Sequence, residues 1–444
     1  MSFTRRKILS STLFGAGLLG LRSLATGIPT KLLAGGPQAF AEAAATCGNA
    51  AKAQYVILAT SGSGDPLNAN APGTYGGGAI ASVSHNLDPA MAQTAFKMGG
   101  TQTTAAMPWS TTATGGQFTQ DVLDRMSVFH LMTNTPVHPR EPDVLSLMDA
   151  TAPKEMLPSL LSRQLAGCLG TVQNQPITLG AASPSEGLSF GGQALPVIPP
   201  LALKATLTNP SGTLAGLTKL QALRDDTLSK INDIYRRSAT RAQKDYLDSV
   251  ITSQAQIRSI NQDLLSALGS ITDNSVASQI IAAVVLIQMN VTPVIAIHIP
   301  FGGDNHSDVG LANEALQTTS GLGSIAFLMS QLKAMSNATG SMFDQTSLIT
   351  LNVFGRTMAA VHTDGRDHNP NHQVSLAIGK PFKGGVFGGL APVGNDFGAT
   401  KIGDIAPIDT LASFGQTIMS AVGVDQGTIT KSITAGKVIA QALA

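Results

Sequence analysis

The stretch that decides the fold is 276–353, in which helix-like and strand-like apolar runs alternate. Residues 276–289 read VASQIIAAVVLIQM, which is long enough for a buried helix, and residues 291–299 read VTPVIAIHI, a short β-branched run typical of a buried strand. Residues 311–335 are amphipathic and predict a second helix, and residues 347–353, SLITLNV, predict a second strand. This alternation predicts an α/β protein in which helices cover a mainly parallel sheet.

Three further apolar runs predict strands, at residues 54–60, 126–132 and 374–378. Residues 66–118 are polar and rich in Gly and Thr, and residues 175–212 are interrupted by Pro and Gly, so we expect loops and irregular structure there. Between residues 214 and 268, Leu and Ile recur at near-helical spacing, which predicts two or three helices that form a cap or an outer layer.

Residues 1–41 resemble an export signal of the twin-arginine (Tat) type. Arg5 and Arg6 precede an apolar run at 8–21, and Ala39-Phe40-Ala41 is a small-x-small cleavage site. The sequence therefore predicts a periplasmic or extracellular protein that meets the Tat translocase during export. The apolar run is short for a membrane span, so we expect no stable transmembrane segment after cleavage; an uncleaved anchor is the alternative.

The composition narrows the classes of function. A net charge of +1 gives no basic surface for nucleic acid, so we expect no nucleic-acid partner. Charged residues make up 12% and hydrophobic residues 43% of the chain, which is typical of a folded, loop-rich secreted protein. The two cysteines, Cys47 and Cys168, either pair in an oxidising compartment or remain free thiols.

Acidic residues and histidines are concentrated in two segments that each follow a predicted strand. Asp304 and His306 lie in the first, and Asp367 and His368 lie in the second. Carboxylates and imidazoles bind divalent metals, so the four residues together predict one metal centre at the edge of the sheet, for Zn, Mg or Ca. Single Asp residues in such segments also serve as turn formers or helix caps.

Three other residues nearby are weaker candidates. His138 follows the predicted strand at 126–132, and His372 ends the segment that holds Asp367 and His368; each is either a ligand or a surface-loop histidine. Arg356 either clamps an oxyanion with its guanidinium or forms an ordinary ion pair.

Several motifs, in order, resemble a known family. They are Ser63-Gly64-Asp65-Pro66-Leu67-Asn68, Gly303-Asp304-Asn305-His306-Ser307, Phe354-Gly355-Arg356-Thr357, Asp367-His368 and Lys383-Gly384-Gly385-Val386-Phe387-Gly388. With the Tat-type signal they resemble the domain of unknown function 1501 family, which is grouped with the alkaline phosphatase and sulfatase superfamily. The resemblance implies a three-layer α/β/α sandwich over residues 50–444, with a helical insertion at about 213–270.

The resemblance also implies a set of metal ligands. One ion would be held by Asp65, Asp367 and His368, and a second by Asp304 and His306. His372 is the candidate for the remaining ligand of the second ion. In this superfamily a Ser, Thr or modified Cys attacks the ester. In this chain the candidate nucleophiles are hydroxyl groups near the strand ends, among them those of Ser63 and Thr135.

The chain departs from the family pattern at three places. Asn352-Val353 replaces a Ser-Glu pair, Asn369 replaces a Gly, and Val137-His138 replaces a Ser-His pair. Two functions are therefore open. One is a metal-dependent hydrolase of small anionic phosphate or sulfate esters, in which Arg356 bears developing charge. The other is a non-catalytic periplasmic or cell-surface binding or assembly protein derived from that fold.

Overall fold

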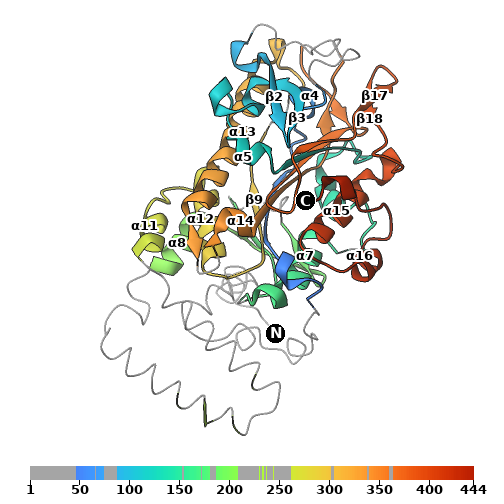
Figure 1. Cartoon of the computed structure of the whole chain (residues 1–444). Helices are drawn as coiled ribbons and strands as arrows, with labels where there is room; N and C mark the ends of the chain where they lie inside the picture. Colours follow the sequence, from blue (N-terminus) through green and yellow to red (C-terminus); the bar gives the residue numbers. More distant parts are fainter. Residues whose placement is uncertain are drawn as a thin grey trace, which may run out of the picture.

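The structure is a computed structural model. It describes residues 47–65, 67–74, 88–152, 155–171, 173–180, 187–208, 262–301, 305–337, 340–359 and 364–444, with a few single positions between 230 and 244. The predicted signal at 1–41, most of the predicted helical insertion and the predicted ligand Asp304 lie outside the described residues. Figure 1 shows a central sheet with helices on both sides of it.

The sheet has eight strands in the order β16-β4-β15-β12-β1-β9-β5-β8. Their bounds, in that order, are Gly385–Phe387, Met126–Leu131, Gln373–Ile378, Thr346–Asn352, Tyr55–Ser61, Val294–His298, Ile177–Leu179 and Val197–Ile198. β15 is antiparallel to both of its neighbours, whereas every other neighbouring pair is parallel. The sheet is therefore mixed but mainly parallel, and every strand except β15 ends at the same edge.

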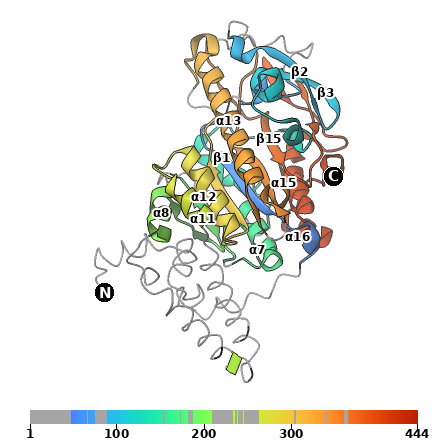
Figure 2. The ribbon, with the colours of Figure 1, turned by 60° about the vertical axis from the view of Figure 1, so that its left-hand side comes forward.

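Alternating side chains of the central strand β1 contact two different cores, because successive residues of a strand point to opposite faces. Ile57 packs in the core that also holds residues of α12 (Val276–Gln288) and α13 (Ala312–Ala334). Val56 and Leu58 pack in the core that holds residues of α7 (Leu157–Leu169) and α15 (Thr410–Ala421). Figure 2 shows α12 and α13 on one side of the sheet and α15 on the other. Both faces of β1 are buried, which explains the apolar run at 55–59 that makes up most of it.

The smaller elements connect and cover this frame. The remaining short helices are α4 (Leu67–Asn70), α5 (Gln120–Leu123), α6 (Glu141–Leu145), α8 (Pro200–Thr208), α11 (Gln262–Gly269), α14 (Met342–Gln345) and α16 (Gln426–Ser432). Five two-stranded ribbons pair β2 (Gln93–Met98) with β3 (Thr101–Ala106), β6 (Ser189–Phe190) with β7 (Gln193–Ala194), β10 (Ser336–Asn337) with β11 (Gly340–Ser341), β13 (Gly355–Arg356) with β14 (His368–Asn369), and β17 (Leu390–Val393) with β18 (Asp396–Ala399).

The strongly patterned predictions of the frame are confirmed, and two predictions of irregular structure are wrong. All five predicted strands appear, as β1, β4, β9, β12 and β15, and both predicted helices of the stretch 276–353 appear as α12 and α13. Residues 66–118 are not only loops, because they contain the β2–β3 hairpin. Residues 175–212 supply β5 and β8 to the main sheet and then form α8, so they are not a wholly irregular excursion.

A disulfide joins Cys47 to Cys168 near the end of α7, with 5.4 Å between the Cα atoms and 121 residues of sequence separation. Of the two alternatives left open by the sequence, the structure has the pair. The bond fastens the beginning of the described chain to the helical layer on one face of the sheet.

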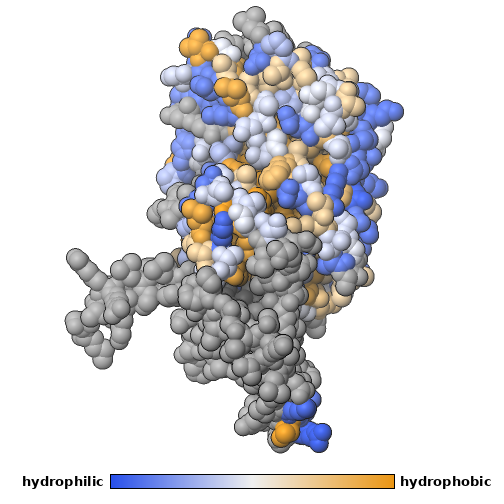
Figure 3. Space-filling model, turned by 90° about the vertical axis from the view of Figure 1, so that its left-hand side faces the viewer, coloured by the Kyte–Doolittle hydropathy of each residue, from blue (hydrophilic) through white to orange (hydrophobic). Residues whose placement is uncertain are grey.

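No described helix is both long enough and apolar enough to cross a bilayer. Figure 3 shows hydrophobic residues interspersed with hydrophilic ones on the face of the molecule that carries α8 and α13. Isolated exposed side chains such as Leu201 and Leu316 belong to this mixture and are normal for a folded protein.

Candidate functional site

The site lies where four strands end and one begins. β1, β4, β9 and β12 all end at one edge of the sheet, and the antiparallel β15 starts there. The segments that follow the first four strands, and the segment before β15, therefore meet at this edge. This is the edge at which open α/β sheets place their binding sites.

Three imidazoles and one carboxylate meet at this edge; we call His138, His306, Asp367 and His368 the histidine cluster. Nδ1 of His306 lies 2.8 Å from Oδ1 of Asp367, and Nε2 of His306 lies 3.1 Å from Nε2 of His368. The ring of His138 stands perpendicular to that of His368, with 4.6 Å between the centroids. The structure thus brings together three of the four residues that the sequence predicted as one metal centre, and adds the weaker candidate His138.

Each imidazole of the histidine cluster is oriented through its Nδ1 atom. His138 donates to the carbonyl oxygen of Gly62 at 2.8 Å, His368 donates to that of Pro136, and His306 donates to the carboxylate of Asp367. A hydrogen bond from one ring nitrogen to an oxygen fixes the tautomer, so the lone pair of a neutral ring is on Nε2. This is the arrangement that metal-binding histidines adopt.

Phe354 contacts both the histidine cluster and the turn that follows β1. Its ring lies 4.3 Å from that of His368 and 4.9 Å from that of His138, measured between centroids. On the other side it touches Gly64, where an added Cβ would come within 1.9 Å of the ring and φ is +71°. Only glycine fits both the space and the backbone conformation at this position.

A buried ion pair holds the loop of Asp367 and His368 in place. Arg366 donates two hydrogen bonds to the carboxylate of Glu314 in α13, and both side chains are fully buried. The backbone N–H of Arg366 donates to the carbonyl oxygen of Asn305 at 2.7 Å, beside His306. Gly365 contacts the same strand-end loop so closely that an added Cβ would lie 2.3 Å from the carbonyl oxygen of His306. The loop of His306 and the loop of Asp367 and His368 are therefore packed as one unit on α13.

Arg356 is buried and donates to backbone carbonyl oxygens. Its guanidinium bonds Gly64 and Ser63 at 2.8 Å each and Arg366 at 3.3 Å. These contacts fasten the turn after β1 to the loop of the histidine cluster. The described contacts give Arg356 a positioning role, and neither the predicted oxyanion clamp nor the ordinary ion pair is seen among them.

Asp65 is buried, and its backbone N–H donates to the carbonyl oxygen of Phe354 at 3.2 Å. It is 1% exposed; Ser61 donates to Oδ1 at 3.1 Å, while Oδ2 has no hydrogen-bond partner among the described residues. Burial raises the pKa of Asp65 to about 7, and nearby Glu141 adds to the rise, while Ser61, His298 and Arg356 oppose it. The hydrogen bonds of Asp65 in the described part of the chain do not reach Asp367 or His368, the partners that the resemblance implied.

His372 belongs to a different buried group. Its Nε2 lies 2.8 Å from Nδ1 of His130, and its Nδ1 lies 3.2 Å from the amide nitrogen of Asn68. Nε2 of His130 lies 3.0 Å from the carbonyl oxygen of Pro72. Burial lowers the pKa of His130 to about 4 and that of His372 well below its usual range. With both ring nitrogens engaged in this chain, His372 does not face the histidine cluster.

Each of the two predicted nucleophiles is next in sequence to a residue whose carbonyl oxygen accepts a hydrogen bond from the histidine cluster. Ser63 is half-buried and follows Gly62, which accepts from His138. Thr135 is buried, accepts from the N–H of Val137, and precedes Pro136, whose carbonyl oxygen accepts from His368. Ser63 is therefore the more accessible of the two hydroxyls.

Sequence reasoning missed Glu141, which lies 2% exposed in α6 and accepts a hydrogen bond from Thr60 of β1. It is one of several charges in a polar segment, and no pattern marks it as buried. Among the described residues, no three His, Cys, Asp or Glu side chains already surround one point closely enough to hold a metal ion.

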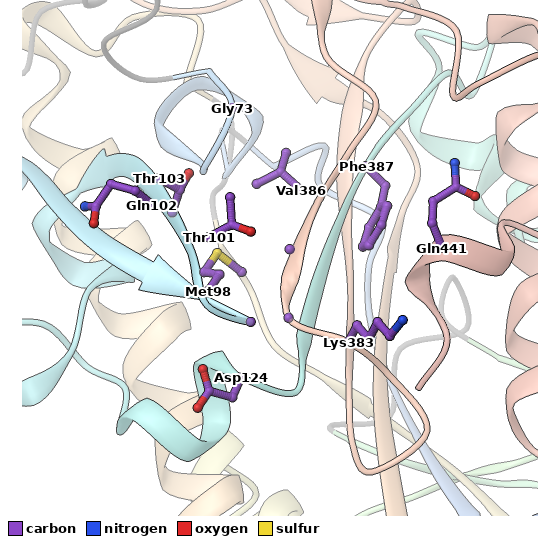
Figure 4. Close-up of a pocket in the computed structure, with 13 residues that line it drawn as sticks. Gly73, Met98, Thr101, Gln102, Thr103, Asp124, Lys383, Val386, Phe387 and Gln441 are labelled. Atoms are coloured by element: carbon purple, nitrogen blue, oxygen red, sulfur yellow. The ribbon is translucent and has the colours of Figure 1, made fainter.

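A pocket of about 630 Å³ lies elsewhere, between the β2–β3 hairpin and the edge strand β16. Figure 4 shows Met98 and Thr101 on the hairpin side and Val386 and Phe387 on the side of β16. No residue of the histidine cluster lines this pocket, and none of the predicted site residues does.

Fold and site together define an α/β protein with a histidine-bearing site at the carboxyl edge of a mainly parallel sheet. No curated protein matches the chain. A family model described as "Protein of unknown function (DUF1501)" matches residues 186–438, more than half of the chain. The chain belongs to the DUF1501 family, as its motifs predicted.

Proposed function

We propose that the chain is an exported metal-binding protein with the three-layer fold of the alkaline phosphatase and sulfatase superfamily, and that it hydrolyses phosphate or sulfate esters. Helices on both faces of a mainly parallel sheet support the fold. A polar site at the carboxyl edge of that sheet supports a ligand there.

The observation that carries the proposal is the histidine cluster itself. His306 and His368 come from loops that follow different strands, yet their Nε2 atoms face each other and their Nδ1 atoms are tied to oxygen. Imidazoles prepared in this way fit a divalent metal. When bound, the ion would polarise the ester and acidify the water beside it. Asp304, which the sequence predicts as a further ligand, lies outside the described residues.

The chain's own residues would shape the reaction space. Arg356 holds the carbonyls of Ser63 and Gly64 and so fixes the turn after β1. Ser63, half-exposed in that turn, is the better-placed hydroxyl for attack on an ester.

A second function, a non-catalytic binding or assembly protein at the cell surface, is favoured by one observation. The guanidinium of Arg356 is buried and occupied by backbone carbonyls, so it is not directed at a substrate anion. Such a protein would bind metal without hydrolysing esters.

The test is to purify the full chain without chelator, measure divalent metals by elemental analysis, and assay aryl phosphate and aryl sulfate esters. The hydrolase proposal predicts a stoichiometric ion, and predicts that His306→Ala with His368→Ala removes both ion and activity. Metal binding without hydrolysis across a broad panel of esters would favour the binding protein. Absence of any stoichiometric divalent metal would refute both.

Export is proposed from the twin arginines, and the Cys47–Cys168 disulfide agrees with an oxidising compartment. Replacing Arg5 and Arg6 by Lys should retain the protein in the cytoplasm, as judged by cell fractionation, because the Tat receptor reads the arginine pair. Unchanged periplasmic delivery of that variant would contradict the proposed route.

A further inference from the structure

The contact between Nε2 of His306 and Nε2 of His368 specifies how the proposed metal would be held. We infer that these two nitrogens bind one and the same divalent cation, and that Asp367 stands behind His306 as its orienting carboxylate, not as a ligand. The inference rests on the proposed metal binding. It departs from the arrangement implied by the resemblance, in which His306 and His368 serve different ions and Asp367 is a ligand.

The positions of the protons require a positive charge between the two rings. The carbonyl oxygen of Pro136 can only accept, so Nδ1 of His368 carries a proton. The carboxylate of Asp367 likewise accepts from Nδ1 of His306. In neutral rings both Nε2 atoms then present lone pairs, and these face each other at 3.1 Å. Two lone pairs at this distance repel each other unless a proton or a metal ion lies between them.

The separation suits a shared ion. Two nitrogens bonded to one tetrahedral ion at about 2.0–2.1 Å stand about 3.3 Å apart. The Nε2 atoms of His306 and His368 are 3.1 Å apart, so a shift of a few tenths of an ångström would admit the ion. Ligands of two different ions would direct their lone pairs toward two separate points.

Asp367 contacts Nδ1 of the His306 ring, whereas the proposed ion would bind Nε2, so Asp367 is not placed to be a ligand of that ion. Its Oδ1 bonds Nδ1 of His306, across the ring from Nε2, and its side chain is 67% exposed. A carboxylate in this place fixes the ring and makes Nε2 a better donor. Removing such a carboxylate typically weakens metal binding by about 10–100-fold without removing a ligand.

The donor set also narrows the kind of ion. Two imidazole nitrogens suit Zn²⁺ and similar borderline ions better than Mg²⁺ or Ca²⁺, which prefer oxygen. His306 is 40% exposed, so water reaches the ion on the outer side. The ring of His138, perpendicular to that of His368 with 4.6 Å between the centroids, is a further imidazole beside this pair.

The test is cobalt(II) titration of the metal-free full chain, followed by its visible absorption and by elemental analysis. We expect one cobalt per chain with absorption of a nitrogen-ligated ion. His306→Ala and His368→Ala should each weaken binding at least about 100-fold and alter the spectrum. Asp367→Asn should keep the stoichiometry and the band positions while weakening binding about 10–100-fold. The control is Asp364→Asn, a second exposed aspartate of the same loop, which should change nothing.

Two results would overturn the inference and leave the proposed metal binding intact: two cobalt ions per chain, or loss of the ion in Asp367→Asn to the same extent as in His306→Ala. Failure of the native protein to bind cobalt or zinc would overturn both, and would mean that a proton alone lies between the rings.

Discussion

Replacing Glu314 by Gln should destabilise the protein more than any single exposed substitution. The carboxylate of Glu314 accepts two hydrogen bonds from Arg366, and both side chains are 0% exposed. Gln keeps one acceptor oxygen, but it removes the negative charge and turns an N–H₂ group toward a guanidinium. Breaking a buried pair in this way costs about 3–5 kcal/mol, because one charge stays buried without its partner.

The matched control is Asp143→Asn, which removes a carboxylate from the exposed pair with Arg140. That pair has the same kind of arginine–carboxylate contact, at 2.6 Å, but its side chains are 47% and 43% exposed. Water solvates both charges after the change, so we expect a loss of less than about 1 kcal/mol. Free energies of unfolding from urea titrations compare the two variants directly.

A double variant separates charge burial from simple loss of packing. Glu314→Leu with Arg366→Met replaces the pair by apolar side chains of similar length, and should recover most of the stability that Glu314→Gln loses. The reasoning is refuted if Glu314→Gln costs no more than Asp143→Asn. It is also refuted if the double variant is as unstable as Glu314→Gln.

Three further predictions concern stability. The pKa of His130 is lowered to about 4 and that of His372 well below its usual range, so the unfolded chain takes up these two protons first, whereas Asp65, with a pKa raised to about 7, holds a proton in the folded chain only. The unfolded chain then carries a net excess of one proton between about pH 6.5 and 4, so the free energy of unfolding should fall by up to about 1.4 kcal/mol per pH unit as the pH drops through that window; urea titrations at several pH values would show it, and a profile that rises toward pH 4 would contradict it. Replacing Cys47 and Cys168 by Ser should lower the free energy of unfolding by about 3–5 kcal/mol, because the bond closes a separation of 121 residues; dithiothreitol should reproduce the loss in the native chain and have no effect on the variant. Gly64→Ala should lower the melting temperature far more than Gly100→Ala: both have positive φ, but only the first places Cβ against a phenylalanine ring, so equal losses would contradict the packing argument.

The central frame was predictable because its segments are long or strongly patterned. Strand β1 is buried on both faces and α12 is apolar almost throughout, so each gives an unambiguous run. The β2–β3 hairpin was missed because most of its residues are polar and its strands are partly exposed. β5 has only three residues, too few for any period to emerge. The antiparallel direction of β15 depends on the path of the preceding loop, which residue patterns do not encode.

The site was predictable in its residue types but not in its grouping. His306, Asp367 and His368 stood out because imidazoles and carboxylates cluster after strands. Which of these side chains face one another depends on the orientation of the imidazole rings. That orientation is set by hydrogen bonds to carbonyl oxygens such as that of Pro136. Asp65 carries an equally suggestive motif, yet its side chain is buried and accepts a hydrogen bond from Ser61, and the sequence does not show that burial.

The reversed strand β15 lets the loop at 353–372 begin and end at the same edge of the sheet. The chain leaves β12 at Asn352 and re-enters the sheet at Gln373 in the adjacent strand, so both anchor points sit at one edge. A connection between two neighbouring parallel strands has to cross from one edge of the sheet to the other, whereas the connection from β12 to the antiparallel β15 only has to turn back. Its length can therefore change without shifting the register of β12 and β15, provided that Arg356 keeps its bonds to Ser63 and Gly64 and Arg366 keeps its pair with Glu314. Insertions are therefore best tolerated between these fixed contacts, and not at Arg356 or Arg366.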